Sequence, residues 1–278
     1  MTKPLAFEID GKKKINLGDI DPGDTAGWKK SEGLIELEKL GAELAELTNL
    51  LTYAGDQSLL MVFQGRDASG KDGVIRQVLQ FANVLAAQVC PFKAPTEDER
   101  AHDFLWRVHK VVPARGKLAL FNRSHYEDVI AVRVHKLAPK EVWQARYDAI
   151  NDFERLLRDN RTIVLKFMLH VSKAEQRRRL IEREQDPRTA WKLNVNDWRE
   201  VPLWDDTTKA YDDVLRKCSS KDLPWFVVPA DHKWFRNLAV FERTVLALRP
   251  HKAGWLAKLK EVRREALKEI RALRGSKD

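Results

Sequence analysis

Residues 58–82 read SLLMVFQGRDASGKDGVIRQVLQFA, and they predict a strand, a loop and a helix in that order. The apolar run at 59–63 is typical of a central parallel strand. The loop at 65–71, GRDASGK, has the spacing G-x-x-x-x-G-K, and apolar residues then recur at helical spacing. Glycines allow such a loop to point its backbone N–H groups inward, and the helix N-terminus adds partial positive charge. The stretch therefore predicts a phosphate-binding loop.

The side chains of this loop depart from the usual pattern at one position. Lys71 is placed to reach the outer phosphates, but Asp72 follows it, where a Ser or Thr hydroxyl usually binds magnesium. A second carboxylate, Asp67, lies inside the loop, and two acids there would repel phosphate unless cations intervene. We therefore interpret Asp67 as a group that organises Mg²⁺, directly or through water. The loop residues expected to contact phosphate are Gly65, Ala68, Ser69, Gly70, Lys71 and Asp72.

The composition is that of a soluble globular protein. Of 278 residues, 44% are hydrophobic and 33% are charged. No apolar run approaches about 18 residues and the N-terminus lacks a signal-peptide core, so we expect a cytoplasmic protein without a membrane span. Cys90 and Cys218 lie in unrelated segments, which makes a disulfide unexpected. The net charge of +9 indicates a polyanionic partner: nucleic acid, a membrane surface or an inorganic polyanion.

Strand and helix patterns alternate along the rest of the chain. Four further strands are predicted, at 84–92, 117–121, 162–169 and 224–230, with helices expected at 31–54, after Thr96 and at 139–158. This alternation predicts a five-stranded parallel sheet between two layers of helices, a three-layer αβα sandwich. Residues 1–30 are expected to form an irregular arm. Because no repeat or low-complexity linker interrupts the pattern, we expect one domain over 1–278.

A strongly basic segment lies between the last two predicted strands, at 172–218. Ser172 and Glu175 have the spacing of a capping box, and the helix that follows carries several arginines. A solvated helix face is the ordinary explanation of such a pattern. The segment, however, leaves the carboxyl end of a strand, where ligands bind in α/β sheets. We therefore expect a basic lid that binds phosphates through arginine and excludes water.

The end of the strand at 117–121 carries a second polar cluster. In many P-loop enzymes the neighbouring strand ends in an Asp that holds magnesium, but Asn122 occupies that position here. Arg123 follows at once, where it would face the phosphates and neutralise charge during transfer. Glu127 and Asp128 come within about a turn, so the expected metal ligands shift to Asp67 and these acids.

Several separated motifs resemble the polyphosphate kinase 2 family. They are GRDASGKDG, FKAPT, FNRSHYEDV, EQRRRLIER with DPRTAWK, and LWDD followed by PWFVVPADHKWFRN, and they span roughly residues 34–249. The resemblance implies a P-loop kinase fold with a helical lid. It also implies Mg²⁺-dependent phosphoryl transfer between inorganic polyphosphate and adenine or guanine nucleotides. Glu127 resembles the glutamate of members that phosphorylate nucleoside monophosphates as well as diphosphates.

The resemblance implies roles for individual residues. The expected catalytic residues are Asp67, Lys71, Arg123, Glu127, Asp128, Arg178 and Arg179. Contacts to phosphate or nucleotide outside the loop are expected from Lys93, Arg123, Arg133, Arg183 and Lys192. Mg²⁺, or Mn²⁺ in its place, is expected at Asp67, Glu127 and Asp128.

Three other functions compete with this one. An ATP-dependent nucleoside monophosphate kinase has the same fold and mechanism, and adenosine-specific contacts at the donor site would favour it. A GTP-binding switch needs an N-K-x-D motif, but no Asn here precedes a Lys. Nucleic-acid binding suits the net charge, yet the nine Trp residues are scattered rather than arranged as a stacking platform. We therefore expect neither a nucleic-acid nor a membrane partner, and we expect a homo-oligomer, a dimer or tetramer.

Overall fold

The structure is a computed structural model that describes residues 4–11 and 16–275 of the chain. Six strands form one sheet with the order β1-β6-β5-β2-β4-β3. The strands are β1 Phe7–Ile9, β2 Ser58–Gln64, β3 Ala87–Pro91, β4 Leu118–Asn122, β5 Thr162–His170 and β6 Trp225–Pro229. Strands β2 to β6 are parallel to their neighbours, and β1 pairs antiparallel with β6 at the sheet edge.

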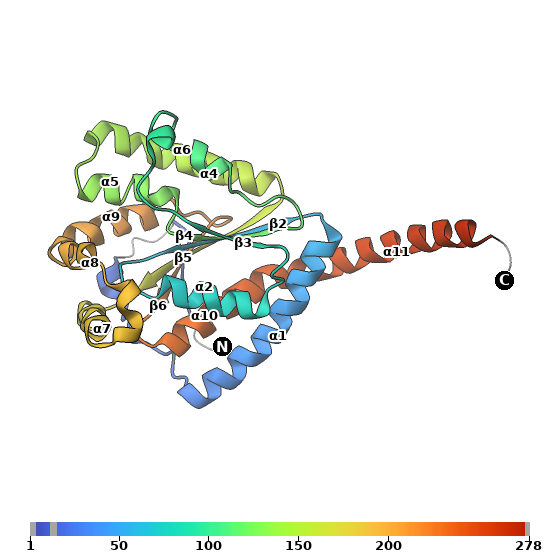
Figure 1. Cartoon of the computed structure of the whole chain (residues 1–278), viewed down its shortest axis with the longest axis horizontal. Coiled ribbons are helices and arrows are strands. Elements are labelled where there is room, and N and C mark those ends of the chain that lie inside the picture. Colours follow the sequence, from blue (N-terminus) through green and yellow to red (C-terminus); the bar gives the residue numbers. More distant parts are fainter. Residues whose placement is uncertain (1–3, 12–15, 276–278) are drawn as a thin grey trace.

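Helices cover both faces of this sheet (Figure 1). The longer ones are α1 Lys30–Ala54, α2 Lys71–Phe81, α6 Lys140–Asp159, α7 Lys173–Gln185, α9 Trp204–Lys217, α10 Lys233–Leu248 and α11 Lys252–Arg274. Short helices are α3 Glu97–Arg100, α4 Trp106–His109, α5 Ala131–Val134 and α8 Val195–Glu200, with 3₁₀ turns η2 His125–Asp128 and η3 Pro187–Lys192 among others. None of the helices within the described ranges has the length and apolarity that a membrane crossing requires.

Alternate residues of each strand enter two separate hydrophobic cores. On β2, Leu59, Met61 and Phe63 pack with α1, α2 and α10, whereas Leu60 and Val62 pack with α6 and α9. This period of two follows from strand geometry and gives both faces of the sheet an apolar surface. The predicted three-layer αβα sandwich is therefore confirmed.

Two features of the fold differ from the expectations. The sheet has six strands rather than five, because residues 7–9 of the expected irregular arm pair with β6. A three-residue strand carries almost no periodic signal, so only its pairing with an existing edge defines it. In addition, Ala210, Tyr211, Val214 and Leu215 of α9 belong to the hydrophobic core. The expected lid at 172–218 is thus shorter, since α9 forms part of the helical layer.

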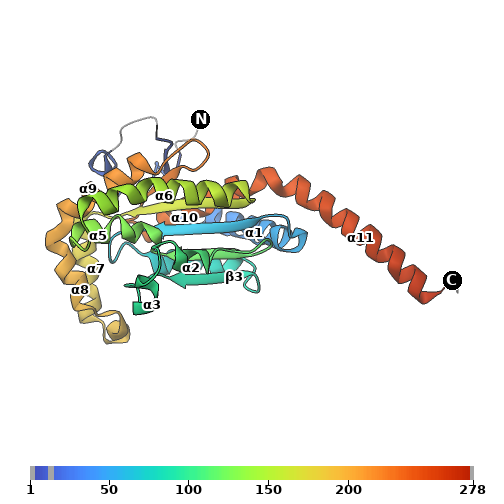
Figure 2. The same cartoon turned by 90° about the horizontal axis from the view of Figure 1, so that it is seen from above.

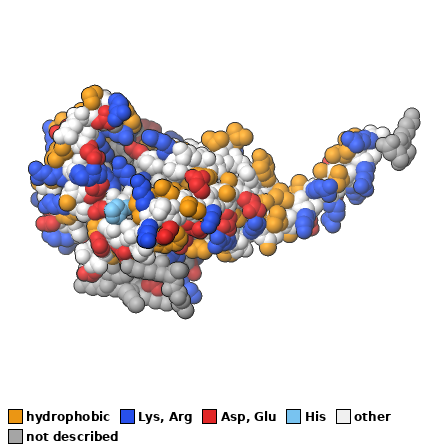
Figure 3. Space-filling model, turned by 90° about the horizontal axis from the view of Figure 1, so that it is seen from below, with side chains coloured by type: hydrophobic (Ala, Val, Ile, Leu, Met, Phe, Trp, Pro, Cys, Tyr) orange, Lys and Arg blue, Asp and Glu red, His pale blue; other side chains and the backbone are white. Residues whose placement is uncertain are grey.

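Helix α11 leaves the body of the protein and projects outward (Figure 2). Trp255 near its start is buried and packs into the core, while most of the later residues are exposed. The face of α11 visible in Figure 3 carries Lys and Arg side chains together with hydrophobic ones. Part of the basic excess of this chain therefore lies on an exposed helix and not at the loop between β2 and α2.

The parallel strands end together at the edge of the sheet where α2 begins. Gln64 of β2 aligns with Met168 of β5, and Phe63 aligns with Asn122 of β4. Ligands of open α/β sheets bind outside the carboxyl ends of the strands. The register therefore brings the loop after β2 and the polar turn after β4 to one place.

Candidate active site

The loop between β2 and α2 has the backbone that a phosphate-binding loop requires. Gly65 and Gly70 adopt φ values of 150° and 101°, which favour glycine, and Ala68 also has a positive φ of 63°. A Cβ atom on Gly65 would lie 2.8 Å from the carbonyl oxygen of Leu169 on the neighbouring strand. Both glycines of the motif are therefore needed, one for close packing on β5 and one to begin α2.

Lys71 is the first residue of α2 and lies back across the loop. Its Nζ donates to the carbonyl oxygen of Gly65 at 2.6 Å and to that of Arg66 at 3.1 Å. Burial of the ammonium group, with Arg123 nearby, lowers the pKa of Lys71 to about 8. The lysine is thus held in the loop, beside the α2 N-terminus.

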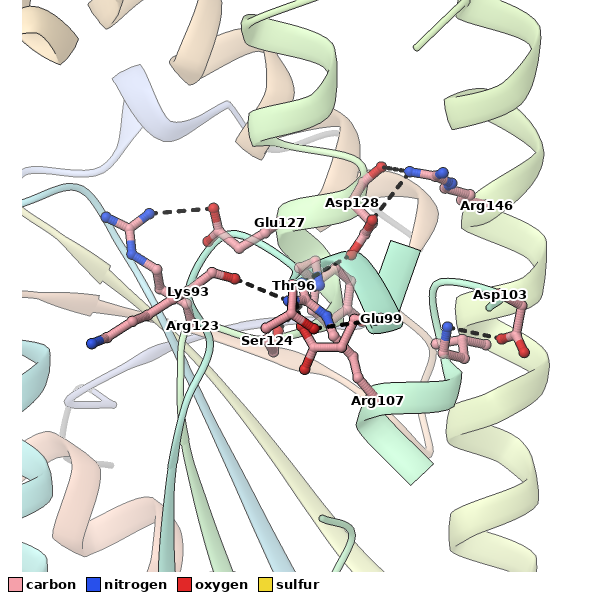
Figure 4. A network of polar contacts seen from close by, with 12 residues as sticks. Lys93, Thr96, Glu99, Asp103, Arg107, Arg123, Ser124, Glu127, Asp128 and Arg146 are labelled. Atoms are coloured by element: carbon pink, nitrogen blue, oxygen red, sulfur yellow. Dashed lines mark hydrogen bonds and ion pairs between the residues drawn. The ribbon is translucent and has the colours of Figure 1, made fainter. Parts of the chain in front are cut away.

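Arg123 connects the loop to the turn after β4. Its guanidinium pairs with Asp67 of the loop and, at 3.2 Å, with Glu127 of η2 (Figure 4). The Glu127 carboxylate raises the pKa of Arg123, although burial acts in the opposite direction. Burial alone would raise the pKa of Asp67, but Lys71 and Arg123 outweigh it and the pKa lies below its usual value. Both carboxylates therefore flank one fixed cation.

Asn122 and Asp72 form a second bridge between the same two segments. The Asn122 side-chain amide donates to the Asp72 carboxylate at 2.6 Å. The residue after the loop lysine is therefore tied to the strand-end position that carries a metal-binding Asp in many P-loop enzymes. This hydrogen bond uses one oxygen of the Asp72 carboxylate.

Two cavities meet at this cluster and share Asp67, Arg123, Asn194 and Asp197 in their walls. The smaller, of about 250 Å³, has apolar groups from Ile130, Val134, Trp204 and Tyr211 beside polar ones. The larger, of about 830 Å³, runs past the phosphate-binding loop. Its walls contain eight Lys and Arg side chains against five Asp and Glu, so its charge suits an extended anion.

The arginines of α7 divide into structural and exposed groups. Arg179 is buried and donates to the carbonyl oxygens of Ala68, Ser69, Ala230 and Asp231, which fixes the loop to the end of β6. Arg178 instead lies in solvent and pairs with Glu175 and Glu182, and it is on neither cavity wall. The Glu175 carboxylate accepts hydrogen bonds from these two arginines. The N–H of Ser172 donates to the Asp231 carboxylate instead of to Glu175. The expected reciprocal capping box is therefore only half present.

The other predicted basic residues divide into those that line a cavity and one that does not. Lys93 and Lys192 line the larger cavity, and Arg183 lines it while pairing with Asp197 at 2.7 Å. Arg133 is on neither cavity wall, and it pairs with Asp213 of α9 at 2.7 Å. It therefore joins α5 to α9.

The structure places Asp128 apart from Asp67 and Glu127. Its carboxylate faces Arg146 at 3.2 Å and Arg107 at 3.5 Å, and Figure 4 shows it turned away from Arg123. Burial raises the pKa of Asp128 above its usual value, although these arginines oppose the shift. Adjacent residues in the tight 3₁₀ turn η2 point in different directions, so Glu127 pairs with Arg123 whereas Asp128 pairs with Arg107 and Arg146.

The carboxylates at the loop suit a divalent cation that is bound partly by the substrate. Within residues 4–11 and 16–275, no three His, Cys, Asp or Glu side chains are grouped to hold a metal ion by themselves. Mg²⁺ usually takes one or two protein carboxylates together with substrate phosphates and water. Asp67 and Glu127 supply such a pair, and Oε1 of Glu127 is a buried acceptor without a hydrogen-bond partner in the described structure. These two residues therefore fit Mg²⁺.

A buried ionic network supports the turn that carries Glu127. Lys166 of β5 donates to Glu154 at 2.6 Å, and Tyr126 of η2 donates to the same carboxylate at 2.6 Å. Lys166 and Glu154 are almost fully buried. Burial would raise the pKa of Glu154, but Lys166 and His125 outweigh it and keep the pKa low. The network fixes η2 on the central strands.

Sequence reasoning missed three residues of the site. The Arg66 guanidinium lies 3.8 Å from the ring centre of Trp204 and bonds to α9, so it joins the loop to the smaller cavity. Arg236 of α10 is buried against the start of α2, and Lys233 lines the larger cavity. The motif PWFVVPADHKWFRN contains the latter two residues, but spacing alone did not separate them from helix-surface cations.

Comparison with known proteins agrees with this geometry. The family model described as Polyphosphate kinase 2 matches residues 27–253. The AMP/ADP-polyphosphate phosphotransferase of Meiothermus ruber is 44% identical over 84% of this chain and 88% of its own length. The ADP-polyphosphate phosphotransferase of Rhodopseudomonas palustris is 39% identical over 86% of this chain and 87% of its own length.

A solved structure has the same fold. The crystal structure of polyphosphate kinase 2 from Arthrobacter aurescens TC1 aligns with a TM-score of 0.85 at 39% sequence identity. The alignment covers 90% of each chain. The two chains therefore share the fold over nearly their whole length.

Proposed function

This chain belongs to the polyphosphate kinase 2 family, and on that premise we propose that it transfers phosphoryl groups between inorganic polyphosphate and nucleotides. The observation that carries the proposal is the junction of two unlike cavities at Asp67 and Arg123. The larger, cation-rich cavity suits a linear polyphosphate. The smaller one, with Trp204 and Tyr211, suits a nucleoside. Reacting phosphates from the two sides would meet at Arg123.

The reaction asks for positioning and charge neutralisation more than for covalent chemistry. Transferred phosphoryl groups pass through a transition state with charge on the equatorial oxygens and with the attacking and leaving oxygens in line. The acceptor is itself an ionised phosphate, so no strong base is required. Lys71, the N–H groups of the loop and Arg123 are fixed before substrate binds, which makes their stabilisation of that charge effective.

Asp67 and Glu127 are the proposed ligands of Mg²⁺, which would neutralise phosphate charge when bound. The chain itself prepares the site, since Arg123 pairs with both carboxylates. Arg179 supports the loop backbone, because it donates to the carbonyl oxygens of Ala68 and Ser69 and ties them to the end of β6. We assign Asp128 no contact with the reacting groups.

We further propose that monophosphates are accepted as well as diphosphates. The resemblance of Glu127 to the glutamate of such members supports this, and so does the similarity to the AMP/ADP-polyphosphate phosphotransferase of Meiothermus ruber. We also propose that the protein is cytoplasmic and forms a homo-oligomer, a dimer or tetramer. Light scattering coupled to gel filtration tests the oligomer directly.

Phosphorus NMR tests the function. The protein is incubated with Mg²⁺, long-chain polyphosphate and AMP, without ATP. Formation of ADP and then ATP is the expected result. ATP formation from added ADP but no reaction with AMP would remove the monophosphate proposal. Turnover of a monophosphate only when ATP is supplied would show a conventional nucleoside monophosphate kinase instead.

A further inference from the structure

Arg236 is a buried cation without an acidic partner. Its residue is only 3% exposed, and its guanidinium donates through Nε and Nη2 to the side-chain oxygen of Asn237. Across the described part of the chain, no carboxylate lies within ion-pair distance of it. A charge removed from water is costly unless it is paired, so a buried arginine with one neutral acceptor needs an explanation.

The guanidinium lies against the first turn of α2. A Cβ atom on Gly70 would be 1.8 Å from its Nη1, and one on Gly73 would be 3.2 Å from its Nη2. Arg236, Gly70, Gly73 and Lys71 all line the larger cavity. The absence of side chains at both glycines therefore leaves room for the arginine beside a helix N-terminus that attracts anions.

A comparison with Arg179 shows that Arg236 has no comparable structural task. Both arginines are buried near the loop. Arg179 donates to four backbone carbonyl oxygens and to Glu175, so its charge and its donors are satisfied by the protein. Arg236 donates to one side-chain amide alone. Burial, with Arg179 nearby, lowers the pKa of Arg236 to about 10, as expected for a cation that lacks its counter-ion.

We propose that Arg236 is a phosphate-binding residue whose counter-ion is a phosphoryl group of polyphosphate, bound in the larger cavity beside the start of α2. The assignment rests on the proposed function. It adds a donor-side contact that comes from α10, whereas the predicted arginines came from α5, α7 and the turn after β4. The phosphates of a nucleotide could bind Arg236 in the same way, so the experiment measures the binding of polyphosphate and of ADP separately.

The test uses the full chain with Arg236→Met, Arg236→Lys and a matched control, Arg243→Met. Arg243 lies on the same helix but pairs with Glu8 and Glu242 and bonds to the backbone of Ala6. Thermal melting is measured for each free protein and with tripolyphosphate or ADP. Kinetics give the KM for polyphosphate and for ADP separately.

For Arg236→Met we expect a melting temperature equal to or above that of the wild type, because an unpaired buried charge has been removed. Its tripolyphosphate-induced shift should be lost, and its KM for polyphosphate should rise about 10- to 100-fold, the effect of one charge-assisted hydrogen bond. The KM for ADP should stay unchanged. Arg236→Lys should recover part of the polyphosphate affinity, and Arg243→Met should melt earlier but bind tripolyphosphate normally.

A normal tripolyphosphate shift in Arg236→Met, or a free protein that melts below the wild type, would overturn the proposal. Loss of the ADP response alone would overturn the donor assignment in favour of a nucleotide contact. If Arg236→Met does not fold, an unchanged polyphosphate KM in Arg236→Lys gives the same negative answer. Failure of the proposed function gives a different result, because the wild-type protein would then not consume polyphosphate. The assignment of Arg236 to the donor would then be wrong as well.

Discussion

Asn122 at the end of β4 donates a 2.6 Å hydrogen bond to Asp72, the residue that follows the loop lysine. In many P-loop enzymes these two positions hold an Asp and a Ser or Thr that bind magnesium. Here the two side chains bond to one another. Asp67 and Glu127, the metal ligands proposed above, lie on either side of Arg123.

Glu127 and Asp128 are adjacent in sequence but contact different arginines, so their roles can be tested separately. We expect Glu127→Gln to lower turnover at least about 100-fold and to raise the Mg²⁺ concentration needed, as for loss of a charge-stabilising group. Asp128→Asn should mainly lower the melting temperature, because it weakens contacts to Arg107 and Arg146. Steady-state kinetics over a Mg²⁺ titration checks both. A folded Asp128→Asn protein without activity would restore Asp128 to the mechanism.

Glu127 also allows a test of acceptor choice. If it supports monophosphate acceptance, Glu127→Asn should reduce the rate with AMP more than the rate with ADP. The measurement is the ratio of the two kcat/KM values at saturating polyphosphate and Mg²⁺. An unchanged ratio would show that Glu127 does not determine the choice of acceptor.

The lowered pKa of Lys71 predicts two opposite pH effects. Its folded value is about 8 and its ordinary value is 10.5, so the unfolded chain binds more protons between these values. In the absence of ligand, the contribution of Lys71 to the free energy of unfolding should therefore rise with pH across this interval. Tripolyphosphate affinity should fall over the same interval, because the neutral amine no longer attracts phosphate.

Thermal melts and calorimetric titrations of wild type and Lys71→Met, compared at each pH, isolate this contribution. The variant should lack transfer activity while it folds normally. A difference in stability between the two proteins that does not change above about pH 8 would contradict the lowered pKa.

Arg178 and Arg179 form a second matched pair, adjacent on α7. Arg178→Ala should change turnover less than about twofold, because an exposed pair with Glu175 and Glu182 contributes little. Arg179→Ala leaves four carbonyl groups near the loop without their donor and should reduce both stability and kcat. Melting temperature and kcat are measured together. A large loss of polyphosphate affinity in Arg178→Ala would indicate that the lid closes onto phosphate in the working enzyme.

The buried Lys166–Glu154 pair predicts a strong asymmetry between single and double substitutions. Lys166→Met leaves a buried carboxylate without its cation and should cost about 3–5 kcal/mol of unfolding free energy. The double variant Lys166→Met with Glu154→Met should be closer to the wild type. Urea unfolding of the wild type, the two single variants and the double variant gives the coupling energy between Lys166 and Glu154. Additive losses would show that the ion pair is not the source of stability.

The sequence alone determined the nature of the fold and the position of the loop between β2 and α2. The apolar run at 59–63, the glycine spacing and the following helical period are local signals, and each of them persists in the structure. The alternation of strands and helices likewise predicted the parallel core of the sheet. β1 was not predicted, because a strand of three residues is too short to show a detectable alternation of side chains.

Only the tertiary structure decided which charged groups act together. Sequence spacing could not separate Arg178 from Arg179 or Glu127 from Asp128, because adjacent residues on a helix or tight turn point in different directions. It also could not place Arg236 beside Gly70, since the contact joins segments more than a hundred residues apart in the chain. Local pattern fixes which element forms, whereas the interactions of a charge depend on which distant elements pack around it.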